Sequence, residues 1–318
     1  MPADHLTTAS PAKIAAAVLV VLSGADLEST ATETRMSPVE LADAVQLFQA
    51  AGLTALEQRS EWYQLAIEFA EERTAESAGA MYLGLRLDRL QDQGVVQGWW
   101  FLRKPPGWRL RVHTTDRPAV DRALRELVEE RVIARWWSTI YEPETFAFGG
   151  PDGTDIAHEL FCADSHGVLA YARQKAADQG RRELSLLLIN ALLREAGLDW
   201  FERGDVFGRV AAIRPAPPGN QTSAVEKLAP NVRTLLLVPR QADRRLLADT
   251  LAFVEPWLAA YETAGQRLGD AAARGRLDRG LRAVLTHVLI FHWNRFGLSA
   301  TTQGVLAHAA KAAFLPRS

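Results

Sequence analysis

Apolar residues recur at helical spacing along residues 1–77, and this pattern predicts a helical N-terminal module. The first expected helix follows Ser10 and ends before Gly24, which favours a short buried helix over a signal peptide. The second begins at the capping box Ser37–Glu40. A third helix is expected after Ser60, with apolar positions at Trp62, Leu65, Ile67 and Phe69.

The pattern then changes to an alternation with period two, which predicts a β-hairpin. Its strands are Trp99–Arg103 and Trp108–His113, and the turn Lys104–Gly107 joins them. Arg109 and Arg111 fall on one face of the second strand, because side chains alternate between the two faces. Two guanidinium groups on one face can clamp a carboxylate or an amide oxygen. The alternative is a solvated face whose arginines pair with nearby glutamates.

Beyond the hairpin the pattern becomes mostly helical. An amphipathic helix is expected over residues 118–134, and a further strand over residues 136–141. Helices dominate after Asp155, with a break at residues 215–220. We therefore expect an α+β fold, in which the helical N-terminal module precedes a mixed α+β domain over residues 78–318 with a helix-rich C-terminal half.

Composition narrows the function classes. The chain of 318 residues has a formal net charge of −2, so no overall basic field favours nucleic acid. A single cysteine, Cys162, excludes an internal disulfide, and the seven histidines form no HExxH motif, which argues against a metal site. No glycine-rich phosphate loop indicates a nucleotide cofactor. The apolar run Ile14–Leu22 is too short to cross a membrane, so we expect a cytoplasmic protein without nucleic-acid or membrane partners.

Two segments in the middle of the chain carry candidate chemistry. Tyr141 ends a strand, and Glu142 and Glu144 follow it before a Gly-Gly turn. Strand ends of this kind present catalytic groups on rigid scaffolds, and the alternative is a turn with surface acids. Asp164 and Ser165 lie between two apolar helical stretches, where an ordinary helix N-cap is the alternative. A Ser–His–Asp hydrolase is a weaker interpretation, because no GxSxG motif surrounds Ser165.

A third segment, His292-Trp293-Asn294-Arg295, lies at the end of an apolar helix that Gly297 closes. His292 and Arg295 are candidate polar groups of a site. In the alternative interpretation, His292 is a hydrogen-bonded core residue and Arg295 is a cation favoured at a helix C-terminus.

Taken in order, these segments resemble the C-terminal elimination domain of class I lanthipeptide dehydratases. The pattern W-x-x-x-Y-x-P-E, then aromatic-Gly-Gly, then F-x-A-D-S runs from Trp137 to Ser165. Trp108–Arg111 looks like the H-L-R-L-R strand of that family, and the late histidine segment looks like its N-R helix. The resemblance covers about residues 79–318 and implies the fold of that domain. Members eliminate glutamate from glutamylated Ser or Thr, and stand-alone versions belong to thiopeptide biosynthesis, as eliminating partners or as pyridine synthases.

The departures from the eliminating members favour a pyridine synthase. Where those members carry E-x-x-R-Y-G-G, this chain has Ala147 at the arginine and Phe148 at the tyrosine. Trp108 replaces the histidine of the strand, and Ile290 replaces a histidine of the late helix. A charge-assisted partner of a carboxylate contributes about 1.5–3 kcal/mol, so its loss indicates a substrate without a glutamyl group.

As a pyridine synthase the chain would catalyse a formal [4+2] aza-cycloaddition between two dehydroalanines of an azole-containing precursor peptide. The ring aromatises with loss of water and of the leader peptide, and the resemblance implies no cofactor and no metal. Proton transfer is expected from Tyr141, Glu144, Ser165 and His292. Substrate contacts are expected from Trp99, Trp100, Arg109, Arg111, Trp293, Asn294 and Arg295.

The expected partner is a ribosomally made precursor peptide, a leader followed by a dehydrated azole core; other enzymes of the pathway are further candidates. The leader would dock on the N-terminal module or on an arginine-lined face made of Arg122, Arg125, Arg233, Arg240, Arg244 and Arg245. Two alternatives stay open. In the first, the chain is a stand-alone glutamate-eliminating lyase that forms dehydroalanine in the same pathway. In the second, it is a non-catalytic module that presents the precursor to other enzymes.

Overall fold

The computed structural model describes residues 10–57, 62–174, 180–214, 222–237 and 253–315. The chain divides into two compact units, Met1–Ser60 and Glu61–Ser318, which are considered separately below. Among the helices of the described residues, none combines the length and the apolar character that crossing a bilayer requires.

The described part of the N-terminal unit consists of helices around a small core. These helices are α1 Pro11–Leu22, α2 Leu27–Thr34 and α3 Pro38–Glu57. As expected, α1 begins after Ser10, and Gly24 beyond its end has a φ angle of 105°. However, α1 buries only Ala17 and Val18 and leaves Leu19 56% exposed, so the expected buried helix lies at the surface.

The expected third helix after Ser60 is wrong, because Trp62–Phe69 is a strand, β1. Its inward side chains Leu65, Ile67 and Phe69 recur at every second residue, which is strand spacing. The strand belongs to the second unit. The two units therefore divide between Ser60 and Glu61, and not between residues 77 and 78 as the pattern had predicted.

The second unit is built on a four-stranded antiparallel sheet with the strand order β2-β3-β1-β4. Its strands are β1 Trp62–Phe69, β2 Gly98–Lys104, β3 Gly107–His113 and β4 Ile133–Thr139. The expected hairpin is confirmed as β2 and β3. Arg111 lies opposite both Gln64 and Trp100, so these three side chains share one face of the sheet.

The opposite face of the sheet packs against α6, Arg117–Glu129, where the Tyr63 hydroxyl donates to Asp121 Oδ1 over 2.9 Å. The short elements η1 Glu72–Thr74, α4 Ala75–Ala78, η2 Gly79–Leu83 and α5 Gly84–Asp92 lie between β1 and β2 in the chain. The helix expected to reach residue 134 ends at Glu129, because Arg131 adopts a left-handed φ of 60° and β4 begins at Ile133.

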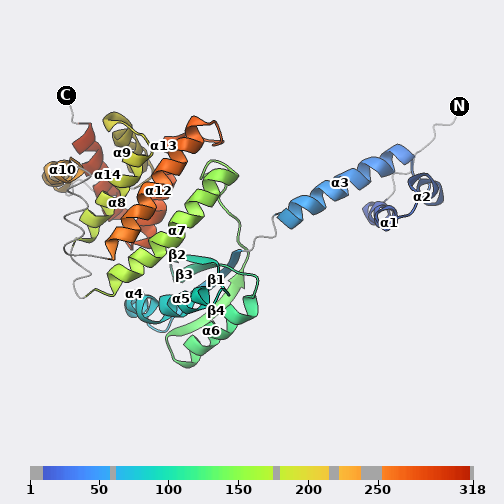
Figure 1. Cartoon of the computed structure of the whole chain (residues 1–318), viewed down its shortest axis with the longest axis horizontal. Coiled ribbons are helices and arrows are strands. Elements are labelled where there is room, and N and C mark those ends of the chain that lie inside the picture. The colour runs from blue at the N-terminus through green and yellow to red at the C-terminus, as the bar shows by residue number, and fades with distance from the viewer. Residues whose placement is uncertain (1–9, 58–61, 175–179, 215–221, 238–252, 316–318) are drawn as a thin grey trace. The chain divides into compact units, whose positions relative to one another are not determined.

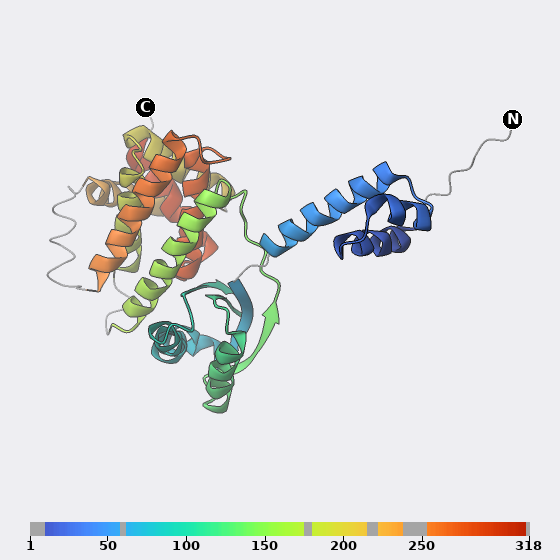
Figure 2. The same cartoon turned by 45° about the vertical axis from the view of Figure 1, so that its right-hand side comes forward.

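The second half of this unit is helical, as expected. Its described helices are α7 Pro151–Ala172, α8 Arg181–Glu195, α9 Trp200–Ile213, α10 Thr222–Leu236, α12 Val254–Ala273, α13 Leu281–Arg295 and α14 Ala300–Phe314. The sheet lies between α6 and this bundle (Figures 1 and 2), and both α7 and α13 contact β2. The break expected at residues 215–220 lies outside the described residues.

Candidate active site

A loop leads from β4 to α7 and places Tyr141 against the helix. Gly149 and Gly150 permit the turn at its end, because their φ angles of 83° and 94° lie in the left-handed region. A Cβ atom on Gly150 would lie 2.3 Å from Asp278 Oδ2, so a larger residue would have to displace this carboxylate. The turn starts α7 in a direction that brings His158 to Tyr141, with 2.6 Å between the tyrosine oxygen and His158 Nε2.

Tyr141 and His158 form a neutral pair. Burial raises the pKa of Tyr141 although Arg111 opposes the shift. Burial, together with the smaller effects of Arg111 and His113, lowers the pKa of His158 to about 4. Neither ring is therefore charged near pH 7. The tautomer of His158 decides which of the two groups donates the hydrogen bond.

Arg111 reaches the same place from β3. Its Cζ atom lies 4.3 Å from the centre of the Trp100 ring and 5.5 Å from that of Tyr141. Burial lowers the pKa of Arg111 to about 10, so the guanidinium stays charged at neutral pH. Arg111 Nε and Trp100 Nε1 are buried and have no hydrogen-bond partner among the described residues. Since an unpaired buried donor is costly, both atoms are available to a bound carbonyl or carboxylate oxygen.

A second cluster surrounds Asp164 inside α7, in the interior of the bundle. The carboxylate accepts hydrogen bonds from Trp257 Nε1 and Tyr261 Oη, both over 2.8 Å, from His292 Nδ1 over 2.9 Å and from Arg295 Nη1. Burial opposes ionisation of Asp164, but His292 and Arg295 outweigh it and lower its pKa to about 2. Asp164 is therefore a charged anchor for three helices.

Arg295 links the two clusters. Its Nε atom donates to the Phe101 carbonyl on β2, and its Cζ atom lies 5.7 Å from the centre of the Trp100 ring. Its Nη2 atom is buried and has no hydrogen-bond partner in the described part of the chain. Ser165 binds the same residue of β2, since its hydroxyl accepts from Phe101 N over 3.2 Å. The Ser165 hydroxyl also donates to the Phe161 carbonyl over 2.8 Å.

The structure thus distributes the predicted catalytic residues over two places. Tyr141 and Glu144 lie on the loop after β4, where Glu144 is exposed. Ser165 and His292 are buried in the bundle, and His292 Nε2 lies 3.0 Å from Ser185 Oγ.

The predicted substrate-contacting residues are distributed in the same way. Arg111 and Trp100 lie opposite each other on the sheet face that carries the Tyr141–His158 pair. Arg109 is two residues from Arg111 on β3, so its side chain lies on the same face. Three others have contacts elsewhere. Trp99 packs on His166, Trp293 donates to Ser185, and the Asn294 side chain accepts from Arg214 and Gln303.

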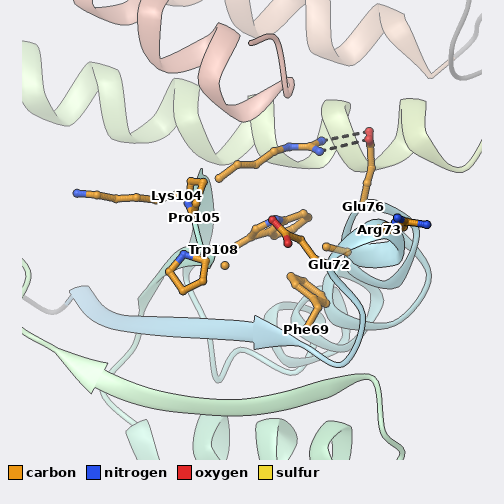
Figure 3. A pocket seen from close by; sticks show the side chains of 11 residues that line it. Phe69, Glu72, Arg73, Glu76, Lys104, Pro105 and Trp108 are labelled. Carbon is orange, nitrogen blue, oxygen red and sulfur yellow. Dashed lines mark hydrogen bonds and ion pairs between the residues drawn. The ribbon is translucent and has the colours of Figure 1, made fainter. Parts of the chain in front are cut away.

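A hollow of about 240 Å³ lies at the hairpin turn, apart from both clusters. Figure 3 shows Phe69 and Trp108 beside it, and the ion pair between Glu76 and Arg103 along one side. Trp108 lines this hollow, stacks on Phe101 and points to the face opposite Arg111. Trp108 therefore does not extend the aromatic surface around Tyr141. Elsewhere among the described residues, no group of three or more His, Cys, Asp or Glu side chains is placed to hold a metal ion.

The sequence of this chain matches a known protein family. A model of the lantibiotic biosynthesis dehydratase C-terminal domain matches residues 62–314. This chain belongs to that family. The resemblance found from the motifs is thereby confirmed, and the family match begins with β1 and omits the N-terminal unit. No curated protein matches the chain.

Solved structures show the same fold. The tRNA-dependent lantibiotic dehydratase MibB from Microbispora sp. 107891 superposes with a TM-score of 0.59 at 18% identity, over 79% of this chain but 28% of its own. TsrL matches with a TM-score of 0.59 at 15% identity, over 80% of this chain and 94% of its own. TbtD, a pyridine synthase from thiomuracin biosynthesis, matches with a TM-score of 0.57 at 12% identity, over 80% and 97%. The expected α+β elimination-domain fold is confirmed, and the chain spans less than a third of MibB.

Two residues that sequence reasoning did not select are central in this family member. Asp164 was noted only beside Ser165, with a helix N-cap as the alternative interpretation of both, but the two residues lie inside α7 and are fully buried. The signal was present in the spacing, because Ile156, Leu160 and Asp164 recur every fourth residue and so share one buried face. His158 lies three residues before Phe161 on an adjoining buried face, but nothing in the sequence pairs it with Tyr141.

Proposed function

We propose that this chain is a pyridine synthase that joins two dehydroalanines of an azole-containing precursor peptide by a formal [4+2] aza-cycloaddition. The observation that carries the proposal concerns Ala147 and Phe148, where eliminating relatives have arginine and tyrosine. Phe148 is buried against Phe161 and Phe291, with ring centres 5.3 and 5.1 Å apart, and Ala147 packs against the same core. An apolar position here offers no charge to a glutamyl carboxylate.

The reaction needs proton transfer and accurate placement. An amide N–H proton moves to the carbonyl oxygen, which creates a 2-azadiene, and two carbon–carbon bonds to the second dehydroalanine close the ring. One ring carbon then loses its oxygen as water, and its neighbour loses the leader as a carboxamide. Holding both dehydroalanines in a reactive arrangement supplies about 7–11 kcal/mol of barrier lowering.

The tyrosine pair suits the proton transfers. Tyr141 and His158 are both neutral at pH 7, so a proton can pass between substrate, phenol and imidazole without a resting buried charge. Arg111 Nε and Trp100 Nε1 supply free donors for the substrate carbonyl whose oxygen gains negative charge. Glu144, exposed on the same loop, is the acceptor for protons that leave toward solvent.

The buried residues act through Arg295. We assign Asp164, Ser165 and His292 the role of holding Arg295 and β2 in place. Asp164 binds Arg295, Ser165 binds β2, His292 binds Asp164, and all three are buried. Arg295 in turn presents its unpaired Nη2 atom near Trp100.

A second candidate, a glutamate-eliminating lyase, is favoured by one observation. The buried guanidinium of Arg111 has a free Nε atom and could hold a glutamyl carboxylate as well as a carbonyl. Mass spectrometry separates the two functions when the protein is incubated with a glutamylated peptide and, in parallel, with a fully dehydrated azole peptide. Cycloaddition predicts loss of water and leader from the second peptide. Glutamate release from the first without leader loss from the second would sink the proposal, and two unchanged peptides would indicate a presenting module.

Docking of the leader on the N-terminal module or on an arginine-lined face stays a prediction. Of that face, Arg122 and Arg125 lie on α6, whereas Arg233 on α10 already donates to the Ala313 carbonyl over 2.7 Å. Arg240, Arg244 and Arg245 lie outside the described residues.

A further inference from the structure

The two edges of the sheet are treated differently. At the β2 edge, Phe101 is buried, and its backbone N–H and carbonyl are bound by the side chains of Ser165 and Arg295. The helices α7 and α13 cover this strand. Two side chains and two helices therefore close the β2 edge to any further strand.

Within the described residues of the second unit, the β4 edge has no such cover. No strand of the described residues pairs with β4 on the side away from β1. Ala134, Arg135, Trp137 and Ser138 are all exposed. The strand contains neither proline nor lysine, and Arg135 is occupied by a two-point ion pair with Glu68 across the sheet face. The pairing of β4 with β1 has one register shift, between the pairs Glu68–Arg135 and Phe69–Ile133 at the start of the strand. Beyond that shift, the unpaired edge of β4 is a template for pairing with another extended chain.

Large apolar side chains are exposed on β4 and on the loop that follows it. Trp137 is 37% exposed, Ile140 83% and Phe146 72%. Ile140 directly precedes Tyr141, so a chain paired along β4 would end beside the loop from which Tyr141 reaches back over β3 and β2 to His158. Flat azole rings and apolar peptide side chains match such exposed aromatic and aliphatic surfaces.

We propose that β4 binds an extended segment of the precursor peptide by strand addition, and that it thereby delivers the dehydrated core to Tyr141. This inference rests on the proposed function for the identity of the peptide. Main-chain hydrogen bonds along β4 supply affinity that tolerates different peptide sequences, while Trp137, Ile140 and Phe146 select azoles and apolar residues.

A backbone methylation series tests the proposal on the unchanged protein. The probe is a synthetic, fluorescein-labelled peptide with a leader and thiazoles, in which alanine replaces one of the two dehydroalanines so that no ring can close. It is made with one N-methyl group at each successive position. In a paired strand only every second N–H faces its neighbour. Fluorescence anisotropy should therefore show affinity losses of about 3–10-fold at alternate positions of one segment, one net hydrogen bond each. A series without this alternation would overturn the proposal.

Hydrogen exchange followed by NMR gives the matching result on the protein side. Peptide addition should slow exchange of the outward-facing amides of residues 133–139, whereas the β2 amides serve as an internal control because that edge is already closed. If light scattering instead shows a dimer, and hydrogen exchange shows that the β4 amides lose their protection on dilution, a second copy of the chain occupies the edge. The inference then fails. Binding is measured without turnover. If affinity is lost at alternate positions but the protein releases glutamate, β4 binds the peptide and cycloaddition is rejected. If the protein performs the cycloaddition but the methylation series shows no alternation, the proposed function stands and strand addition at β4 is rejected.

Discussion

The Tyr141 pair and the Asp164 cluster are both polar groups embedded in aromatic surroundings, yet they are built on opposite principles. Tyr141, on the loop after β4, and His158, on α7, are neutral and adjoin donors without partners among the described residues. Asp164 is ionised and accepts from four side chains in the interior. A neutral pair with free neighbours can exchange protons with a ligand, whereas a saturated ion pair can only fix geometry. Polar character and burial alone therefore do not identify a catalytic group.

The largest expected effect comes from breaking the interior cluster. Asp164→Ala leaves Arg295 and His292 without their buried partner, and the loss of one member of a buried ion pair costs about 3–5 kcal/mol. Urea denaturation should show this loss in the free energy of unfolding. Glu159→Gln is the matched control on the same helix, because its exposed ion pair with Arg267 contributes about 0–1 kcal/mol. Equal losses in the two variants would show that Asp164 is not the anchor.

A substitution in the Tyr141–His158 pair should instead lower activity and leave stability nearly unchanged. Tyr141→Phe removes the hydroxyl that meets His158 and should lower the rate of product formation roughly 10²–10⁴-fold, as expected for a lost proton-transfer group, with little change in stability. Tyr63→Phe is the control, since that hydroxyl binds Asp121 on the opposite face of the sheet. Activity within twofold of wild type in Tyr141→Phe would remove Tyr141 from the mechanism.

Acid should destabilise the two clusters in separate pH ranges. Unfolded His158 takes up a proton below its ordinary pKa of 6.5, while folded His158 stays neutral down to about 4. The neutral buried imidazole contributes about 3 kcal/mol to the free energy of unfolding above pH 6.5, and this contribution is lost as the pH falls to 4. Asp164, with an ordinary pKa of 3.8 and a folded value of about 2, loses its contribution only between those values.

Urea denaturation of wild type and His158→Phe at pH 7, 5 and 4 measures this separation. The stability of the wild type should fall more steeply over that range than the stability of the variant, because only the wild type has the buried imidazole to protonate. Parallel falls would mean that His158 is already protonated, or solvated, in the folded protein.

The sequence predicted the fold where local patterns and tertiary structure agree. The hairpin followed from alternation around Lys104–Gly107, and the helical second half from its spacing. The strand β1 was missed because Trp62–Phe69 contains apolar residues at both spacings, and its neighbours β3 and β4 lie far along the chain. Only those long-range partners decide between strand and helix.

The site was predicted less completely, for a related reason. Motif order placed Tyr141, Arg111, Ser165 and Arg295 in one family pattern, but it could not separate groups that face a ligand from groups that hold the scaffold. The pairing of Tyr141 with His158 depends on the turn at Gly149 and Gly150, whose direction no spacing rule gives. The four-donor arrangement around Asp164 needs α12 and α13 in place.

The smallest effect is expected from a substitution that adds a positive charge to the loop between β4 and α7. Ala147→Arg places a guanidinium on the segment that carries Tyr141 and Glu144, where eliminating relatives have theirs. Ala147 is partly exposed and so leaves room for the longer side chain. A charged hydrogen bond contributes about 1.5–3 kcal/mol, so a glutamylated peptide should bind roughly tenfold or more tighter to the variant, measured by fluorescence anisotropy. Ala147→Gln, long but neutral, is the control. If the two variants bind this peptide equally, position 147 does not distinguish ring closure from elimination, and the proposed function loses its main support.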